Sequence, residues 1–223
     1  MRTKHKLYIS SFLILIVLMA GCANVNKSYP ERTYYMFEIS GNTTPITPVK
    51  GTTVEVKRLS ISPGSQGKQF IYRTTDISYE SDFYNQFFRP PSNIMTEAVS
   101  QWLDKAGLFE DVLNPVSEAF PEYLIEGNVI ELYGDYRNQA AAKAVMRIQF
   151  YLLKTSELSD EPAIIFGKTY VSEKPIGAAT PQALMNGWNL ALEDILGEFL
   201  KDLSYHLKRA QQHSPRNVDN SGS

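Results

Sequence analysis

The sequence of 223 residues contains very little cysteine and no concentration of positive charge. Its one cysteine, Cys22, cannot form an internal disulfide, and alone it cannot build a zinc site. The three histidines, His5, His206 and His213, do not have the spacing of metal ligands or of a catalytic triad. The formal net charge is −2 at pH 7 and Lys and Arg do not cluster, which argues against nucleic-acid binding.

Motifs of enzymes are also missing. Residues 167–169 (Gly-Lys-Thr) resemble the end of a phosphate-binding loop, but Pro162 stands where that loop needs its first glycine. Asp76, Glu80 and Asp82 form a small acidic group, and acid–base chemistry would need them in a tuned cleft that spacing cannot reveal. The sequence therefore predicts a protein that is not an enzyme and that has no cofactor and no metal site.

A positive and then apolar segment opens the chain. Residues 2–6 are basic, and residues 7–19 form a mostly apolar run that is shorter than the roughly 20 residues of a spanning helix. The following Leu-Met-Ala-Gly-Cys sequence, which ends at Cys22, resembles the lipobox of bacterial lipoproteins. We therefore predict a signal peptide over residues 1–21, cleavage after Gly21, and lipidation of Cys22.

The predicted lipid anchor also indicates a location. A single acyl chain binds a membrane only reversibly, whereas several chains make attachment effectively permanent. In enteric-type bacteria an Asp after the cysteine commonly retains lipoproteins in the inner membrane, and here Ala23 stands at that position. By analogy we predict the periplasmic face of the outer membrane. The alternative is an uncleaved anchor, or an ordinary signal with a chance cysteine.

The rest of the chain divides into a tether over residues 22–32, an α+β domain over 33–212 and a disordered tail over 213–223. Alternation and β-branched or aromatic residues predict strands. They cover residues 33–39, 54–61, 69–74, 77–79, 109–113, 123–133, 144–154 and 163–172. Residues 40–53 contain two glycines and two prolines and are predicted as a loop.

Two helices are predicted, one short and one long. Over residues 92–106 apolar side chains recur at three- and four-residue spacing, Ser92 can cap the start, and Gly107 suits the left-handed residue that follows a helix. The second helix begins at Thr180-Pro181 and should run for about 30 residues, or roughly 45 Å. The predicted fold is a two-layer α+β sandwich, with an antiparallel or mixed sheet covered on one face by both helices.

Residues 70–88 are unusually rich in aromatic side chains. Packing in the core and across strands explains most such residues, but exposed rings would form a surface for a partner or for lipid. In a regular strand Phe83 and Phe87 would share one face, and one face should be buried. The possible partner surface consists of Tyr72, Phe83, Tyr84, Phe87 and Phe88.

The order of several short motifs resembles that of a known family. The motifs are Tyr-Tyr-Met-Phe at 34–37, Val-Glu-Val at 54–56, Phe-Ile-Tyr-Arg at 70–73, Arg-Pro-Pro at 89–91, Trp-Leu at 102–103 and Tyr-Leu-Ile-Glu-Gly at 123–127. With the long C-terminal helix, they resemble the auxiliary lipoprotein component of ABC-type transport systems. Members of that family, such as the lipoprotein of the paraquat-inducible system, are partners of MCE proteins. Many relatives carry a Trp before the proline pair, where this chain has Phe87-Phe88-Arg89.

The resemblance implies a lipid-anchored periplasmic domain that docks an MCE protein during lipid transport between membranes, with ATPase and permease as separate proteins. It also implies possible homo-oligomers. The alternative function is a structural or assembly lipoprotein for outer-membrane biogenesis or for export of a surface polymer. Genes next to this one would separate these two functions.

Overall fold

The computed structural model describes residues 31–39, 46–113, 117–156 and 159–213. The strands are β1 (Thr33–Tyr35), β2 (Val49–Val56), β3 (Ser60–Ile61), β4 (Gln69–Arg73), β5 (Tyr79–Phe87), β6 (Phe109–Leu113), β7 (Tyr123–Asp135), β8 (Lys143–Ser156) and β9 (Ser159–Pro175). The helices are α2 (Pro91–Ala106) and α3 (Pro181–His213), and the short 3₁₀ turns are η1 (Pro63–Ser65) and η2 (Gln139–Ala141).

All nine strands belong to one mixed sheet that is organised around β7. On one edge of β7, β8 runs antiparallel along its whole length, and β9 continues the antiparallel order beyond β8. On the other edge β2, β3 and β4 pair in parallel with successive parts of β7. β6 extends the sheet beyond β2, and β5 followed by β1 extends it beyond β4. The sheet thus has a β2–β6 end at the start of β7 and a β4–β5–β1 end at its finish.

The alternation predicted for residues 144–154 sets the two faces of the sheet. Met146, Ile148, Phe150 and Leu152 are fully buried and point to the concave face. Residues between them, such as Arg147, lie on the other face and stay partly exposed. Because side chains alternate with a period of two along a strand, this pattern places the helices on the concave side.

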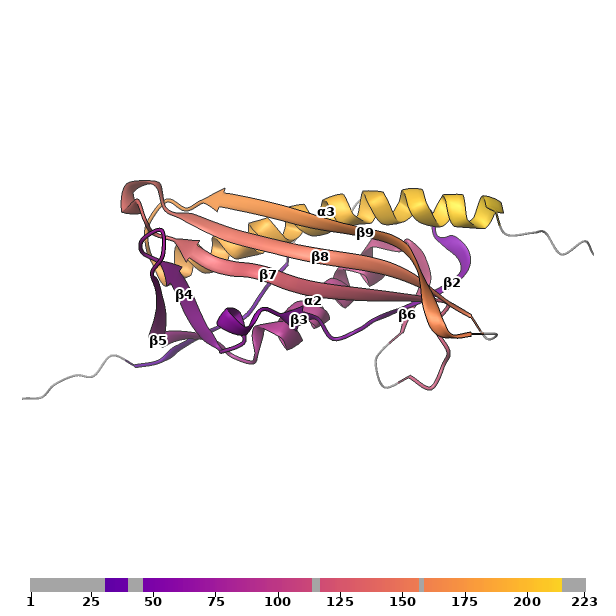
Figure 1. Cartoon of the computed structure of the whole chain (residues 1–223), viewed down its shortest axis with the longest axis horizontal. Helices are drawn as coiled ribbons and strands as arrows, with labels where there is room; N and C mark the ends of the chain where they lie inside the picture. The colour runs from indigo at the N-terminus through magenta and orange to yellow at the C-terminus, as the bar shows by residue number, and fades with distance from the viewer. Residues whose placement is uncertain (1–30, 40–45, 114–116, 157–158, 214–223) are drawn as a thin grey trace, which may run out of the picture. The chain divides into compact units, whose positions relative to one another are not determined.

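Both helices cover that concave face, and α3 runs along β8 and β9 (Figure 1). The long helix buries Leu184, Trp188, Leu192, Phe199 and Leu203 against the sheet, and Phe150 stacks on Phe199 with ring centroids 4.3 Å apart. The predictions of an α+β fold, of an antiparallel or mixed sheet and of two helices on one of its faces are therefore confirmed. The sheet is strongly curled into a half-barrel around them, which differs from a flat sandwich layer.

The ends of the helices agree largely with the sequence. Gly107 follows α2 with φ +63°, in the left-handed region, as predicted. Thr180 accepts a hydrogen bond from the backbone N–H of Ala183 at 3.3 Å and so caps α3. The predicted cap by Ser92 is wrong, because α2 starts one residue earlier at Pro91 and has no side-chain cap. Proline tolerates this first position because the N–H that it lacks has no partner there.

Several strand limits differ from the predictions, among them those of β1, β2 and β5. β1 ends at Tyr35 rather than at residue 39, and β2 begins at Val49, inside the predicted loop. β5 extends to Phe87, whereas only residues 77–79 were predicted to be extended. The first two differences follow from backbone pairing with distant strands, which a local pattern does not reveal. The third arises from an irregularity in β5 that is described below.

Candidate functional site

The candidate site is built on an enlarged bulge in β5. Gln69 pairs with Gln86 and Ile71 pairs with Ser81, so residues 82–85 of β5 stand opposite a single residue of β4. Extra residues in one strand leave the ladder and redirect their side chains. We call residues 82–85 the β5 bulge.

Asp82 fixes the β5 bulge. Its carboxylate accepts hydrogen bonds from the Tyr72 hydroxyl at 2.6 Å and from the Asn85 side-chain amide at 2.8 Å. The backbone N–H groups of Tyr84 and Asn85 also donate to it, at 2.8 and 3.0 Å. Burial opposes the charge of Asp82, but the donated hydrogen bonds outweigh it and lower the pKa of the carboxyl. Burial and the bond to Asp82 raise the pKa of Tyr72, so the phenol stays neutral beside the carboxylate.

Two of the five aromatic residues predicted for a partner surface lie inward. Phe87 is 1% exposed, and its ring centroid lies 4.9 Å from that of Phe70 and 5.6 Å from that of Trp188. Tyr72 is half-buried and stacks on Tyr136 with centroids 4.9 Å apart. These two side chains therefore stabilise the fold beneath the surface.

Phe83, Tyr84 and Phe88 lie outward, with exposed fractions of 58%, 38% and 56%. The prediction that Phe83 shares a face with Phe87 is wrong, because the β5 bulge breaks the alternation between them. The rings of Phe83 and Tyr84 meet edge to face at 5.3 Å. The bulge thus turns two neighbouring rings toward solvent.

Tyr34, which lies in β1, and Arg32, which lies just before it, complete this surface. Tyr34 in β1 is 48% exposed and meets Phe88 edge to face at 6.3 Å. The guanidinium of Arg32 lies 4.3 Å from the Phe83 ring centroid, and the ammonium of Lys68 lies 5.8 Å from that of Tyr34. The aromatic edge, as we name it, consists of Tyr34, Phe83, Tyr84 and Phe88. No local pattern indicated Arg32, which was assigned to the tether, because only the pairing of β1 with β5 brings it here.

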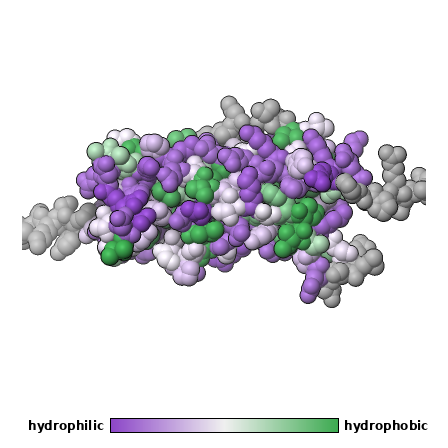
Figure 2. Space-filling model, turned by 45° about the horizontal axis from the view of Figure 1, so that its top comes forward, coloured by the Kyte–Doolittle hydropathy of each residue, from purple (hydrophilic) through white to green (hydrophobic). Residues whose placement is uncertain are grey.

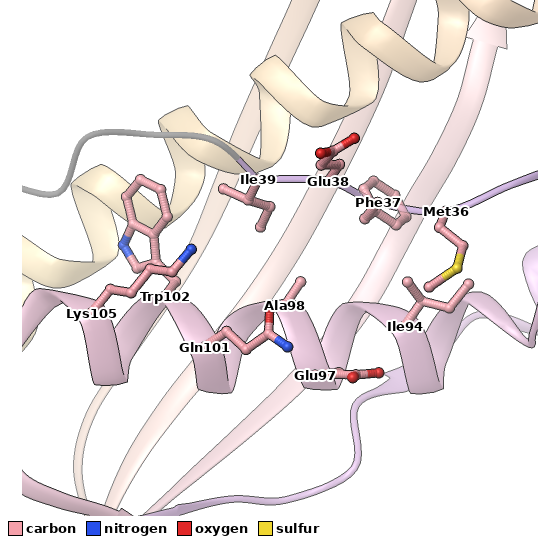
Figure 3. A pocket seen from close by; sticks show the side chains of 10 residues that line it. All are labelled: Met36, Phe37, Glu38, Ile39, Ile94, Glu97, Ala98, Gln101, Trp102 and Lys105. Atoms are coloured by element: carbon pink, nitrogen blue, oxygen red, sulfur yellow. The ribbon is translucent and has the colours of Figure 1, made fainter.

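A second surface feature, the α2 cleft, lies between α2 and the extended segment 36–39 (Figure 3). Its volume is about 400 Å³. The lining residues are Met36, Phe37, Glu38, Ile39, Ile94, Glu97, Ala98, Gln101, Trp102 and Lys105. Apolar side chains form its floor, while Glu97, Gln101 and Lys105 line it from the exposed side of α2.

Trp102 gives the α2 cleft an unusual polar group. The side chain is 7% exposed, and its indole nitrogen is a buried donor with no hydrogen-bond partner among the residues that the structure describes. A buried donor without an acceptor costs about 1–3 kcal/mol. The sequence placed Trp102 on the apolar face of its helix, and that pattern does not show whether the indole N–H has a partner.

Two of the three acidic residues singled out in the sequence, Asp76 and Asp82, make structural contacts. Asp76 forms an ion pair with Arg137 at 2.7 Å, and Asp82 holds the β5 bulge. Within the described ranges, no cluster of three or more His, Cys, Asp or Glu side chains could hold a metal ion. The absence of enzymatic activity remains a prediction.

The other motifs tested for chemistry also lie in regular elements. Residues 167–169 belong to β9, where a Cβ on Gly167 would meet the Tyr151 ring at 2.6 Å, so this glycine accommodates a ring on the neighbouring strand. His206 stacks on Phe166 with ring centroids 4.4 Å apart. Neither arrangement forms a catalytic or phosphate-binding site.

The lipidation and cleavage sites predicted at Cys22 and Gly21, with the signal peptide and most of the tether, lie outside the described residues. The helices that the structure does describe are not long and apolar enough to cross a membrane. On the face drawn in Figure 2, hydrophilic side chains predominate and hydrophobic ones form separate clusters.

No family model matches this chain. No curated protein matches it in sequence either.

Several solved structures share the fold. The crystal structure of XCC0632 from Xanthomonas campestris, a protein of family DUF330, covers 81% of this chain and 99% of its own, with a TM-score of 0.69 and 16% identity. An uncharacterized protein covers 78% of this chain and 99% of its own, with a TM-score of 0.60 and 10% identity. At these identities the likeness shows a common fold alone.

A weaker likeness is to the PelC dodecamer from Paraburkholderia phytofirmans. It covers 69% of this chain and 90% of its own, with a TM-score of 0.39 and 11% identity. That score is too low to support a conclusion about the assembly of this chain.

Proposed function

We propose that this chain is a lipid-anchored protein of the cell envelope that acts without catalysis, as a docking component of an ABC-type lipid transport system with an MCE protein. The anchor is Cys22, the protein lies on the periplasmic face of the outer membrane, and the chain forms homo-oligomers. The lipobox-like sequence supports the anchor, and the order of motifs between residues 34 and 127 supports the system.

The α2 cleft carries the docking role. The concave face of the sheet is already covered by α2 and α3, whose side chains fill the core. Recognition must therefore use outer surfaces, and the α2 cleft offers apolar contacts next to charged groups.

Co-purification with the MCE protein encoded in the same genome tests the proposal. Gln101 lines the α2 cleft and is exposed, so Gln101→Arg should obstruct the cleft without disturbing the core. Gln182→Arg makes the same change on an exposed position of α3 and is the matched control. We expect Gln101→Arg to reduce recovery of the MCE protein about tenfold or more, as expected for a blocked binding surface, and Gln182→Arg to leave it unchanged.

Two outcomes would contradict the proposal. If the wild-type chain does not retain the MCE protein but retains outer-membrane assembly or polymer-export proteins, the alternative function is correct. If both variants retain the MCE protein as the wild type does, the α2 cleft is not the docking site.

The anchor has its own test. Mass spectrometry of the mature protein should find a first residue of Cys22 that carries acyl groups, and Cys22→Ser should abolish them. Separation of inner and outer membranes then locates the anchored protein. A mature chain that begins upstream of Cys22 would show that no lipoprotein cleavage occurs.

Self-association is supported by the sheet edges. Within the described residues β9 pairs with β8 alone, although it is 17 residues long. Long unpaired edges readily pair with other strands. Light scattering of the purified full chain should therefore give a mass above that of the monomer, and a monomeric mass at micromolar concentration would contradict this part.

A further inference from the structure

The aromatic edge is an exposed apolar surface that the fold itself maintains. Tyr34, Phe83, Tyr84 and Phe88 are each between 38% and 58% exposed. The four hydrogen bonds to Asp82 hold the β5 bulge from which two of these rings project. The domain thus orders several polar groups in a way that keeps these rings in solvent. Exposed apolar patches of this kind mark contact surfaces.

The place of the aromatic edge in the chain points to its occupant. β1, which contributes Tyr34, begins at Thr33, and ten residue steps separate Arg32 from Cys22. Even fully extended, that segment reaches only about 35 Å. The lipid attached at Cys22 therefore keeps the first strand within this distance of the bilayer. The C-terminal end of α3 lies at the opposite end of the sheet (Figure 1).

The chemistry of the aromatic edge fits a lipid surface. Tyrosine and phenylalanine side chains enter the boundary between headgroups and acyl chains, and Lys or Arg beside them attract anionic headgroups. Arg32 and Lys68 lie against rings of the aromatic edge. The carboxylate within the β5 bulge, Asp82, is occupied by hydrogen bonds.

We propose that the aromatic edge rests on the bilayer that holds the lipid anchor, so that the β4–β5–β1 end of the domain faces the membrane. This inference depends on the lipid anchor of the proposed function. Four partly exposed rings bind lipid weakly, but the anchor supplies a high effective concentration and turns weak contact into a fixed orientation. The β2–β6 end and the end of α3 then point away from the membrane.

Fluorescence quenching by brominated lipids tests the orientation. The full-length lipidated chain is placed in vesicles of phosphatidylethanolamine and phosphatidylglycerol, with or without bromine on the acyl chains. Phe83→Trp puts a probe on the aromatic edge, and Tyr205→Trp is the matched control, since Tyr205 is 56% exposed near the far end of α3. The native Trp102 and Trp188 are buried and give a baseline from the wild type.

We expect brominated lipid to reduce the emission added by Phe83→Trp about twofold, because a ring at the interface lies near the acyl chains. Tyr205→Trp should respond as the wild type does. Phe88→Trp repeats the test at a second exposed ring, in case the first variant does not fold. Circular dichroism identifies a variant that has not folded.

The outcomes separate the two proposals. If the chain floats with the vesicles but neither probe on the aromatic edge is quenched, the inference is wrong and the anchor stands. Equal quenching at Tyr205→Trp would also contradict it, because the domain would then have no fixed orientation. If the chain does not float with the vesicles, the anchor fails and the inference fails with it.

Discussion

Enlarged bulges in β2 and in β5 lie at opposite ends of the sheet, and the two are built in different ways. In the β2 bulge, residues 50–52 stand opposite one residue of β6. Gly51 adopts φ +71° there, and the buried Thr52 hydroxyl donates to the carbonyl of Val49. The Gly51 N–H also donates to the carboxylate of Glu110, on the neighbouring strand, at 2.5 Å. The β2 bulge therefore combines a left-handed glycine with one bond to a carboxylate outside the bulge, and residues 50–52 include no rings.

The β5 bulge has no left-handed glycine and is held by a carboxylate within the bulge itself. Asp82 accepts four hydrogen bonds, and two of them come from backbone N–H groups that the ladder no longer pairs. The residues between turn Phe83 and Tyr84 to solvent. Both bulges displace residues from the ladder. Those displaced from β5 include two aromatic side chains, whereas those displaced from β2 are Lys50, Gly51 and Thr52.

The sharpest test of this difference compares two phenylalanines, one inside and one just after the β5 bulge. Phe87→Ala should lower the free energy of unfolding by about 3–5 kcal/mol, because it leaves a cavity among buried rings. Phe83→Ala should change it by less than about 0.5 kcal/mol, since Phe83 is an exposed surface residue. Urea unfolding followed by fluorescence measures both. Similar losses for the two variants would mean that the bulge does not expose Phe83.

Removing the charge of Asp82 should break the β5 bulge itself. Asp82→Asn should lower the free energy of unfolding by about 2 kcal/mol at pH 7, because hydrogen bonds to a charged acceptor are replaced by weaker ones. Asp202→Asn is the control and should cost less, since Asp202 accepts two side-chain hydrogen bonds, from the Tyr170 hydroxyl and from Lys168, whereas Asp82 accepts four bonds.

The comparison of the wild type with Asp82→Asn also predicts a pH dependence of stability. The pKa of Asp82 is lowered in the folded state, so its contribution is complete above the ordinary value of 3.8 and is lost as the pH falls through the lowered value. The difference between the wild type and Asp82→Asn should therefore shrink below pH 3.8. Urea midpoints at several pH values measure it, and a constant difference would contradict the role of the charged form.

The β2 bulge should be sensitive at Gly51. A Cβ there would meet no atom within 4 Å, so only the backbone conformation opposes a side chain. Gly51→Ala should cost about 1 kcal/mol, because a left-handed conformation is unfavourable for alanine. Gly64→Ala, which also has open space and has an ordinary φ, is the control and should be close to neutral. Equal effects in thermal unfolding would mean that φ at Gly51 is unimportant.

The β5 bulge also explains why some strands could be predicted from the sequence and most of β5 could not. The strand predicted over 109–113 is β6 at the same limits, and the one predicted over 144–154 is β8 within two residues at each end. The second of these has regular side-chain alternation. Residues 80–85 (Glu-Ser-Asp-Phe-Tyr-Asn) have none, because the bulge interrupts the period, so most of β5 was missed.

The candidate site was predictable only in part. Aromatic composition drew attention to residues 70–88, but only the bulge decides that Phe83 faces solvent and Phe87 does not. Asp82 and Asn85 are residue types that bond to nearby backbone, and they were the one local signal of a bulge. The α2 cleft depends on the approach of segment 36–39 to a helix over 50 residues later, which no local pattern encodes.

The smallest expected effect compares ion pairs near the two ends of β8. Lys143 pairs with Glu173 at 3.0 Å at the β4–β5–β1 end, and Lys154 pairs with Glu122 at 3.6 Å at the β2–β6 end. All four side chains are between 35% and 51% exposed, so solvent and salt screen both pairs. Glu173→Gln and Glu122→Gln should each lower the free energy of unfolding by at most about 0.5 kcal/mol, and less in high salt. If only one variant lost more than about 1 kcal/mol of unfolding free energy, ion pairing would distinguish that end of the sheet, and the structure of the bulge would not.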